Sequence, residues 1–315
     1  MWLYAPNSES PFVNLELHGY PEHADFHPLG VDVFPGSSPA DPFHLLVVNH
    51  GRDNTTIEQF QLSPVAPYRA TYLRTLTSHH FVSPNAVSFT SPSTFYVTQD
   101  HRFTRRLPGF IGKILPLIET LFLPGLTWVN YVVIHPNGQL NITYAARGIP
   151  FANGITISRD KSKVAVASSS KSAIYLYSRT DDGKLKWEEM VQVPFSPDNI
   201  IFDDNDVLIA AGHPSFSALT AVAAQKRHEA PSWVVSIAPR ITPFNAIAAE
   251  KEDSDAPYPA PRRAAISPSY EVTTLYQSNG SGFSSSSTGL WDERSKTLFA
   301  IGLLDEGILT CQRSL

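Results

Sequence analysis

One pattern recurs three times along this chain of 315 residues. In each copy an Asn stands just before an alternating apolar run, which a turn and a second apolar run follow. The three copies begin in the segments Ser83–Val87, Phe151–Ile155 and Pro197–Ile200. A strand–turn–strand unit that recurs on a long period is typical of a repeat architecture, so we expect a chain built from copies of one β-unit.

The Asn residues of these units, Asn85, Asn153 and Asn199, are the first candidates for a functional site. An amide oxygen is a neutral, hard ligand of the kind that Ca²⁺ accepts. Equivalent places in several repeats can converge on one site. The alternative for each Asn taken alone is a turn residue that precedes a strand.

Innermost strands are expected to begin near five residues, which are Gly30, Ala86, Gly154, Ile200 and Gly289. Four-stranded sheets at long, roughly regular intervals fit a β-propeller, whose innermost strands line a central channel. A β-sandwich is the rival architecture, but its turns recur at shorter intervals of about 8–12 residues. The sequence therefore predicts an all-β fold in which residues 1–315 form a single β-propeller domain.

Composition supports a large core and argues against nucleic acid as a partner. Apolar residues make up 42% of the chain and charged residues 17%, so general disorder is not expected. The net charge is −5 and the Lys and Arg residues are scattered, whereas a nucleic-acid footprint needs a basic face. The 26 prolines and 17 glycines suit many turns and short strands.

Three segments depart from the strand pattern. In Phe110–Leu123 apolar residues recur at helical spacing, which predicts a helix between the first and second Asn units. Residues 247–267 begin with an acidic run and continue as a Pro/Ala/Arg-rich stretch, so we expect an exposed, mobile insertion there. The serine run Ser284–Ser287 predicts a loop.

The sequence shows no targeting or spanning segment. Met1–Tyr4 is followed by Pro6 and polar residues, with neither a basic start nor an apolar leader, so no signal peptide is visible. Prolines interrupt the most apolar stretch, Leu107–Val133, which falls short of a spanning helix. Cys311 is the one cysteine and is expected to be a small buried hydrophobe, because it has no internal partner for a disulfide.

Six short peptides together resemble the paraoxonase/arylesterase family. Each is weak evidence alone, but they occur in the family's order and at similar spacing. The peptides are Phe26–Val31, Leu45–His50, Phe95–His101, Phe151–Ile155, Asp198–Ile200 and Gly212–Pro214. The resemblance implies a six-bladed β-propeller with one catalytic and one structural calcium ion in its tunnel. It also implies hydrolysis of lactones and aryl esters.

Position by position, the resemblance implies that the catalytic calcium is bound by Asn85, Asn153, Asp198 and Asn199. Ca²⁺ takes about six to eight oxygen ligands. Several neutral amides leave the ion electrophilic enough to polarise an ester carbonyl, while Asp198 supplies negative charge. This donor set is the chemical basis of the expected Ca²⁺ cofactor.

The chain departs from the family pattern in its first blade. It starts too late to include the family's Glu ligand and the adjacent Asp, and Ala86 replaces the Asp that normally follows the first Asn. We therefore expect about five of six blades, with the first blade largely missing, and a catalytic but no structural calcium site. The family's terminal disulfide would leave Cys311 unpaired, since its partner falls in the missing part. The residues do not decide between a fragment and a divergent member.

The family's histidine pair is half present. His50 matches one position and is the expected catalytic residue, which would assist proton transfer, whereas the other position is Leu29. His27 would share the strand face of Leu29 if the strand extended that far. His101 and His213 end the second strands of their units and are expected to line the tunnel. The alternative for each His is a hydrogen-bonded structural histidine.

Two further features concern surfaces and location. The segment Leu107–Leu126 matches the family's helix that faces a membrane or lipoprotein, and basic residues flank it. The alternative is a helix packed on the propeller. Asn279 begins a glycosylation sequon, which matters only if the chain enters the secretory path. The residues leave the location open, while the resemblance suggests a secreted or membrane-associated protein.

The sequence thus supports two functional hypotheses. The first is a calcium-dependent hydrolase of aryl esters and lactones, with a small ester or lactone as substrate. The second is a catalytically impaired propeller that binds a lipid or a protein partner, which the missing Glu and Leu29 favour. Calcium binding discriminates between them.

Overall fold

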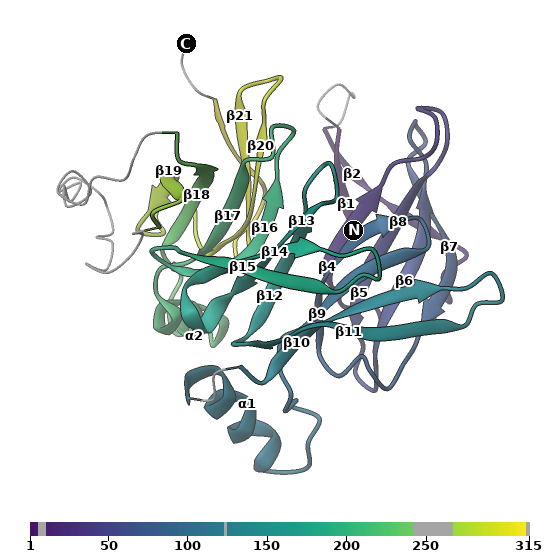
Figure 1. The fold of residues 1–315 in the computed structure, drawn as a ribbon, viewed down its shortest axis with the longest axis horizontal. Coiled ribbons are helices and arrows are strands. Elements are labelled where there is room, and N and C mark those ends of the chain that lie inside the picture. The colour runs from purple at the N-terminus through teal and green to yellow at the C-terminus, as the bar shows by residue number, and fades with distance from the viewer. Residues whose placement is uncertain (6–10, 123–124, 242–266, 313–315) are drawn as a thin grey trace.

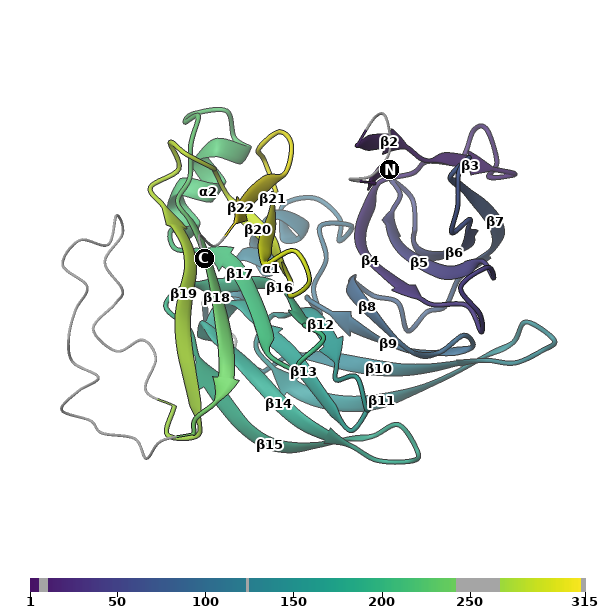
Figure 2. The ribbon, with the colours of Figure 1, turned by 90° about the horizontal axis from the view of Figure 1, so that it is seen from above.

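The computed structural model describes residues 1–5, 11–122, 125–241 and 267–312, and within them the chain forms a five-bladed β-propeller (Figures 1 and 2). The predicted all-β propeller is confirmed. Each blade is an antiparallel meander whose first strand lies innermost. Blade 1 comprises β4 (Pro28–Phe34), β5 (Phe43–His50), β6 (Thr55–Leu62) and β7 (Arg69–Leu76).

Blades 2 to 4 repeat this four-stranded plan. Blade 2 comprises β8 (Pro84–Ser91), β9 (Thr94–Gln99), β10 (Thr127–Ile134) and β11 (Leu140–Ile149). Blade 3 comprises β12 (Ala152–Ile157), β13 (Lys163–Ser168), β14 (Ala173–Arg179) and β15 (Leu185–Gln192). Blade 4 comprises β16 (Ser196–Phe202), β17 (Leu208–His213), β18 (Ser232–Pro239) and β19 (Tyr270–Ser278).

Blade 5 has three strands in the described residues, β20 (Ser286–Asp292), β21 (Thr297–Gly302) and β22 (Leu309–Gln312). The five innermost strands start within a few residues of the predicted positions. The predicted loop Ser284–Ser287 is half wrong, because Ser286 and Ser287 already belong to β20 and are buried. Their side chains are small enough to fit where β20 packs against blade 4.

Helices are few. The predicted helix is α1 (Ile111–Phe122), and a short 3₁₀ turn, η1 (Ser169–Lys171), follows β13. The sequence analysis missed α2 (Phe216–Ala223), although Ser215 caps it by accepting a hydrogen bond from the Ala218 amide at 3.2 Å. None of the helices in the described residues has the length and apolar character needed to cross a bilayer.

The core lies in layers between neighbouring blades. Alternate residues of β5 point to opposite faces of its sheet, so Leu46 and Val48 pack against Val87 and Phe89 of blade 2. Further layers join blades 2 and 3, 3 and 4, and 4 and 5. In the second strands of blades 1 to 4, which are buried on both faces, the apolar runs are nearly continuous.

Two glycines let the innermost strands approach closely. A Cβ on Gly30 of β4 would lie 2.2 Å from the Asn85 carbonyl oxygen of β8. A Cβ on Gly154 of β12 would lie 2.5 Å from the Asp198 carbonyl oxygen and 2.8 Å from the Asn199 Cα in β16. These contacts bring the backbone of each Asn-bearing strand against its neighbour.

The N-terminal residues form a part of the fold that the sequence analysis did not predict. The strands β1 (Trp2–Tyr4) and β2 (Phe12–Asn14) form a ribbon, and β3 (Glu16–His18) adds to blade 1 in parallel with β7. Residues of this region, among them Met1, Leu17 and Tyr20, pack on the outer face of blade 1. The Tyr4 ring also contacts Phe299 of blade 5, with centroids 5.5 Å apart.

The innermost strand of blade 1 is only partly covered. Leu29, Val31 and Val33 of β4 are 44%, 57% and 42% exposed, and they alternate on one face of the strand. In Figure 2, β4 and blade 5 stand on opposite sides of the opening in the ring. The predicted insertion, residues 247–267, lies outside the described residues except for Ser267, which is buried.

Candidate functional site

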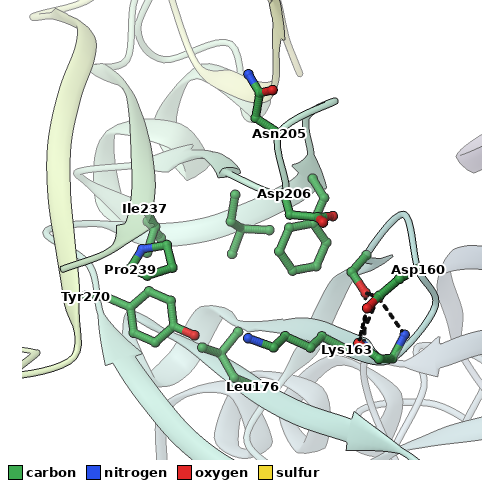
Figure 3. Close-up of a pocket in the computed structure, with 12 residues that line it drawn as sticks. Asp160, Lys163, Leu176, Asn205, Asp206, Ile237, Pro239 and Tyr270 are labelled. Carbon is green, nitrogen blue, oxygen red and sulfur yellow. Dashed lines mark hydrogen bonds between the residues drawn. The ribbon is translucent and has the colours of Figure 1, made fainter. Parts of the chain in front are cut away.

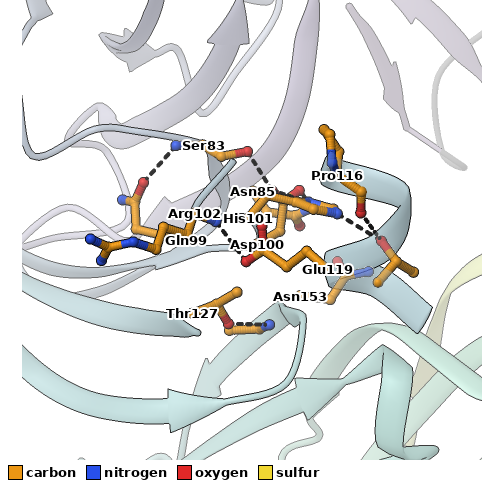
Figure 4. Close-up of polar contacts among 12 residues, drawn as sticks. Ser83, Asn85, Gln99, Asp100, His101, Arg102, Pro116, Glu119, Thr127 and Asn153 are labelled. Atoms are coloured by element: carbon orange, nitrogen blue, oxygen red, sulfur yellow. Dashed lines mark hydrogen bonds and ion pairs between the residues drawn. The ribbon is translucent and has the colours of Figure 1, made fainter. Parts of the chain in front are cut away.

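The candidate site residues all lie at one end of the propeller, because antiparallel pairing joins the start of each first strand to the end of the second. Pro84 is opposite Gln99, Ala152 is opposite Ser168, and Ser196 is opposite His213. The Asn residues at the starts of first strands therefore share this end with the histidines at the ends of second strands. Helix α1 lies at the same end (Figures 1 and 4).

Asn85 is held by a buried carboxylate. Its Nδ2 donates to Asp100 Oδ2 at 3.0 Å, while the Ser83 hydroxyl donates to Asp100 Oδ1 (Figure 4). Burial works to raise the pKa of Asp100, but hydrogen bonds from His101, Ser83 and Asn85 and the charge of His101 outweigh it and lower the pKa. The ionised carboxylate can only accept, so the Asn85 amide must present its nitrogen to it.

His101 has a hydrogen-bond partner on each ring nitrogen. Its Nδ1 lies 2.9 Å from Asp100 Oδ1, and its Nε2 lies 2.9 Å from the Thr120 hydroxyl of α1. Burial works to lower the pKa of His101, but its hydrogen bond to Asp100 and the charges of Asp100 and Glu119 raise it. Thr120 already donates to the Pro116 carbonyl, so both ring nitrogens of His101 donate. The alternative reading of His101 therefore fits its contacts better than a role as a base.

Asn153 has an amide oxygen with no partner. Its Nδ2 donates to the Ser169 hydroxyl at 3.0 Å, and its side chain is buried. Its Oδ1 is buried and accepts no hydrogen bond within the described residues. Such an acceptor costs free energy unless a water or a cation takes its lone pairs. This atom is the strongest sign of a ligand at this end of the propeller.

Asp198 and Asn199 lie side by side on β16 but have different partners. Asp198 Oδ2 lies 3.2 Å from His213 Nε2, and both side chains are largely buried. The second ring nitrogen of His213, Nδ1, is buried without a partner in the described residues. Asn199 Nδ2 donates to the Thr288 hydroxyl of blade 5 at 3.0 Å. The structure thus joins His213, predicted to line the tunnel, directly to a predicted ligand.

His50 points toward the start of β8. Its Nε2 lies 2.5 Å from the Pro84 carbonyl oxygen, which can only accept, so Nε2 carries the proton and Nδ1 is the basic nitrogen. Leu29 is exposed, as described above. His27 precedes the first residue of β4 and pairs with Asp25 at 2.7 Å. Among the hydrogen bonds and ion pairs of the described residues, none joins the side chain of Leu29 or His27 to that of His50. His50 is therefore without a second histidine as partner there.

The donor set fits a calcium ion of modest affinity. The described residues contain no cluster of three or more His, Cys, Asp or Glu side chains, so a cation here would depend on amide oxygens together with Asp198. Calcium accepts carbonyl and carboxylate oxygens, and its affinity rises with the number of charged ligands. Asn153 Oδ1 is an amide oxygen that accepts no hydrogen bond in the described residues, so its lone pairs are available to such an ion.

Helix α1 buries Gly112, Pro116 and Glu119 and exposes several large apolar side chains. The carboxylate of the buried Glu119 accepts the backbone amides of Arg102 and Phe103, at 2.8 and 2.9 Å (Figure 4). The exposed apolar residues in and beside the helix are Phe110, Ile111, Leu117, Leu121 and Phe122, with exposures between 52% and 73%. Ile114, Leu115 and Ile118 are half-buried, so the apolar residues of α1 are divided between a half-buried side and an exposed side.

Two hollows lie away from the predicted residues. One, of about 260 Å³, is at the other end of the propeller between blades 3 and 4, where Asp160, Lys163 and Tyr270 line it (Figure 3). The other, of about 290 Å³, lies between α1 and η1 and is lined by Glu119, Thr120 and Ser170 among others. The second hollow borders the end of the propeller that carries the candidate site.

Sequence reasoning missed three hydrogen-bond partners of the predicted ligands. Asp100 bonds Asn85, Ser169 bonds Asn153 and Thr288 bonds Asn199. Ser169 sits in a run of three serines and Thr288 follows another serine run, so neither stands out by pattern. The sequon residue Asn279 is exposed and its Oδ1 accepts from the Ser281 amide at 3.0 Å. Its glycosylation stays a prediction.

Comparison with known proteins identifies the family of the chain. Residues 3–247 match the family described as Arylesterase, and the chain belongs to that family. Among curated proteins, serum paraoxonase/lactonase 3 of Homo sapiens is 29% identical over 211 residues, which are 66% of this chain and 55% of that protein. Serum paraoxonase/arylesterase 2 of Rattus norvegicus is 30% identical over 193 residues, which are 61% of this chain and 50% of that protein.

The chain spans about half the length of these curated relatives. Solved structures give weaker likenesses. A protein from Lactobacillus plantarum matches with a TM-score of 0.49 and 14% identity over 93% of this chain and 82% of that chain. A luciferin-regenerating enzyme matches with a TM-score of 0.48 and 11% identity over 90% of this chain and 73% of that chain.

Proposed function

We propose that this chain is a calcium-dependent hydrolase of aryl esters and lactones, whose site lies at the end of the propeller that carries the Asn residues. Membership of the arylesterase family supports the reaction class. The relatives named above include a lactonase and an arylesterase, which supports the substrate classes. The observation that carries the site is the buried, unpartnered Oδ1 of Asn153 at the same end as the other predicted ligands.

Four residues would hold the ion: Asn85, Asn153, Asp198 and Asn199. Asp198 has one oxygen toward His213, which leaves the other for the cation. Two of the amides, Asn85 and Asn153, have their nitrogens committed to Asp100 and Ser169. When bound, calcium supplies a Lewis acid that polarises the ester carbonyl.

His50 is the proposed general base. In its tautomer the Nδ1 atom is free to take a proton from an attacking water, while the Pro84 carbonyl holds the ring in place. His213 has a similar arrangement, since its Nε2 faces Asp198 and its Nδ1 has no partner in the described residues. The two histidines are therefore distinguishable candidates, whereas His101 is already saturated on both nitrogens.

The exposed apolar side of α1 is proposed to rest on a lipid surface. Apolar side chains that extend over one side of a helix beside the site, with Arg105 and Lys113 next to them, are typical of an interfacial segment. Binding of the purified chain to anionic phospholipid vesicles tests this. The variant Leu117→Ser/Leu121→Ser should lose most of the binding, and equal binding by wild type and variant would contradict the proposal.

Hydrolysis of phenyl acetate and a γ-lactone, measured as initial rates with calcium and with a chelator, tests the proposed reaction. We expect rates that depend on calcium and that fall at least about 100-fold in His50→Gln, as removal of a general base predicts. A rate lost in His213→Gln but retained in His50→Gln would move the base to His213. No hydrolysis in the wild type at saturating calcium would instead favour the impaired, lipid-binding propeller.

A further inference from the structure

Ser169 lies where blades 3 and 4 meet and touches a predicted ligand directly. Its hydroxyl accepts from Asn153 Nδ2 at 3.0 Å and donates to the Pro197 carbonyl at 2.7 Å. Pro197 immediately precedes Asp198 on β16. One buried hydroxyl thus connects the ligand of one blade to the strand that carries two ligands of the next.

The direction of this hydrogen-bond chain is fixed by its last member. A carbonyl oxygen has no proton, so the Ser169 hydroxyl must donate its single proton to the Pro197 carbonyl. The same hydroxyl can then only accept from Asn153, which forces the amide to present its nitrogen. The amide oxygen consequently faces the other way, where it is the buried acceptor without a partner.

We propose that Ser169 is a positioning residue that sets the orientation of the Asn153 amide, so that the oxygen rather than the nitrogen faces the cation site. The proposal rests on the function proposed above and adds a residue to it. A reversed amide would direct its nitrogen at the ion and an oxygen at the Ser169 oxygen, and both contacts would be repulsive. Ser169 therefore excludes the wrong rotamer of a ligand whose two ends are nearly equal in size.

The backbone of Ser169 fixes the same junction. Its amide donates to the Phe151 carbonyl at 3.2 Å, and its carbonyl accepts from the Ser196 hydroxyl at 3.0 Å. These bonds hold η1 between the strand starts of blades 3 and 4. The hydroxyl is thereby kept within reach of both Asn153 and Pro197.

The other two amides are oriented with different strength. Asp100, an obligate acceptor, forces the nitrogen of Asn85 toward itself in the same way. Thr288 can either donate or accept toward Asn199, so this contact does not by itself fix the amide. Ser169 and Asp100 are thus the two partners that set an amide orientation, and Ser169 is the one that can be changed without removing a charge.

The test is calcium affinity, measured by isothermal titration calorimetry on the wild-type chain and on Ser169→Ala. Loss of a partner that orients a metal ligand typically weakens metal affinity about 10- to 100-fold, and we expect a loss in this range. The matched control is Ser168→Ala, since Ser168 is a buried neighbour whose hydroxyl bonds the Pro150 carbonyl. Ser168 makes no hydrogen bond to Asn153, so its variant should keep wild-type affinity.

Two further variants separate positioning from a loss of stability. Ser169→Thr keeps the hydroxyl and should recover most of the affinity that Ser169→Ala loses. In the Asn153→Ala background, Ser169→Ala should cause no additional loss, because the amide that it orients is gone. Melting temperatures without calcium show whether each variant is folded, and the calcium-induced rise in melting temperature gives an independent measure of binding.

The outcomes distinguish this inference from the proposed function. If the wild type binds calcium and Ser169→Ala binds it equally well, the positioning role is wrong while the hydrolase proposal stands. If Ser168→Ala and Ser169→Ala lose the same affinity, the effect is one of general packing and the positioning role is also wrong. If the wild type binds no calcium at millimolar concentration, the proposed function itself fails.

Discussion

The junction between blades 3 and 4 and the opening between blades 5 and 1 are built in opposite ways. At the first junction Gly154 lets two innermost strands touch, and Ser169 links their polar ends by hydrogen bonds. At the opening between blades 5 and 1, β4 exposes Leu29, Val31 and Val33. The ring of Tyr4 in β1 contacts the ring of Phe299 in blade 5. The candidate ligands are oriented where two blades meet, whereas β4 meets the innermost strand of another blade on one side only in the described residues.

This difference explains why the orienting hydrogen bonds are unevenly distributed over the candidate site. Three predicted amide ligands start innermost strands that pack against another blade, and each has a partner for its nitrogen. The corresponding part of β4 carries Leu29, which is 44% exposed. His50 lies one strand further out and is oriented by the Pro84 carbonyl of blade 2 rather than by a residue of β4. The proposed metal ligands therefore have more orienting partners than the proposed base has.

The largest expected effect is the loss of a ligand at the closed junction. Asn153→Ala should lower hydrolysis of phenyl acetate or a test lactone at millimolar calcium roughly 100-fold or more, since the ion contributes several kcal/mol to the transition state. Initial rates measure this effect. Asn141→Ala, which removes an exposed amide on β11, is the control and should leave the rate unchanged. Unchanged turnover in Asn153→Ala would remove Asn153 from the site.

The close approach of β12 and β16 gives the second prediction. A methyl group at residue 154 would meet the Asp198 carbonyl and the Asn199 Cα at less than 3 Å. Gly154→Ala should therefore lower the free energy of unfolding by about 1–3 kcal/mol, as overpacking does. It should also weaken calcium binding. Gly282→Ala, where a Cβ would have its nearest neighbour at 3.3 Å, is the control, and equal unfolding curves for both variants would contradict the account.

The contact between blades 1 and 2 is expected to depend on pH. Asp32 of β4 accepts the Phe89 amide of β8 at 2.7 Å, and burial raises the pKa of this carboxyl to about 6, although amide hydrogen bonds partly oppose the shift. A raised pKa means that the folded chain holds the proton more tightly than the unfolded chain. Ionisation therefore costs stability as the pH rises from about 4 to about 6, and the cost persists above that range.

Asp32→Asn should accordingly increase the free energy of unfolding by about 1–2 kcal/mol at pH 7.5 and change it little at pH 4. Chemical denaturation at the two pH values measures the difference. The control is Asp181→Asn, which replaces an exposed carboxylate on a turn of blade 3. Stabilisation by Asp32→Asn that is equal at both pH values would show that ionisation of Asp32 is not its cause.

The smallest effect is expected at the opening. Leu29→Ala should change the free energy of unfolding by less than about 0.5 kcal/mol, because the residue is already 44% exposed in the folded chain. Leu46→Ala is the matched comparison in the same blade, since Leu46 is fully buried, and it should cost about 2–5 kcal/mol. Similar losses in the two variants would mean that the opening is covered in solution.

Much of the fold was predictable from the sequence, because strand alternation and repeated strand starts are local patterns. Four features were not. The strands β1 and β2 have three residues each, too few to show alternation. Helix α2 is only eight residues long, and Ser286 and Ser287 are small polar residues in a strand. The orientation of α1 depends on the burial of its own residue Glu119, which the helical spacing of apolar residues does not predict.

The candidate site was partly predictable for a related reason. Asn85 and Asn153 occupy equivalent places in their blades and therefore stand out in the sequence. The register of blade 4 puts Asp198 at that place and Asn199 one residue later, which corrects the expected equivalence of the three Asn residues. Ser169 and Thr288 do not recur, and their roles follow from contacts between different blades. The pairing of Asp198 with His213 likewise depends on the register between β16 and β17. Hydrogen-bond partners that come from a neighbouring strand or blade can be identified only from the three-dimensional arrangement of the strands.

Titration of the purified wild-type chain with calcium, followed by calorimetry, tests the central proposal most directly. We expect saturable binding of one ion, accompanied by a rise in melting temperature, because an oriented but unpartnered amide oxygen gains a partner in the bound state. A flat titration at millimolar calcium, with an unchanged melting temperature, would contradict the proposal that these blades hold a metal ion.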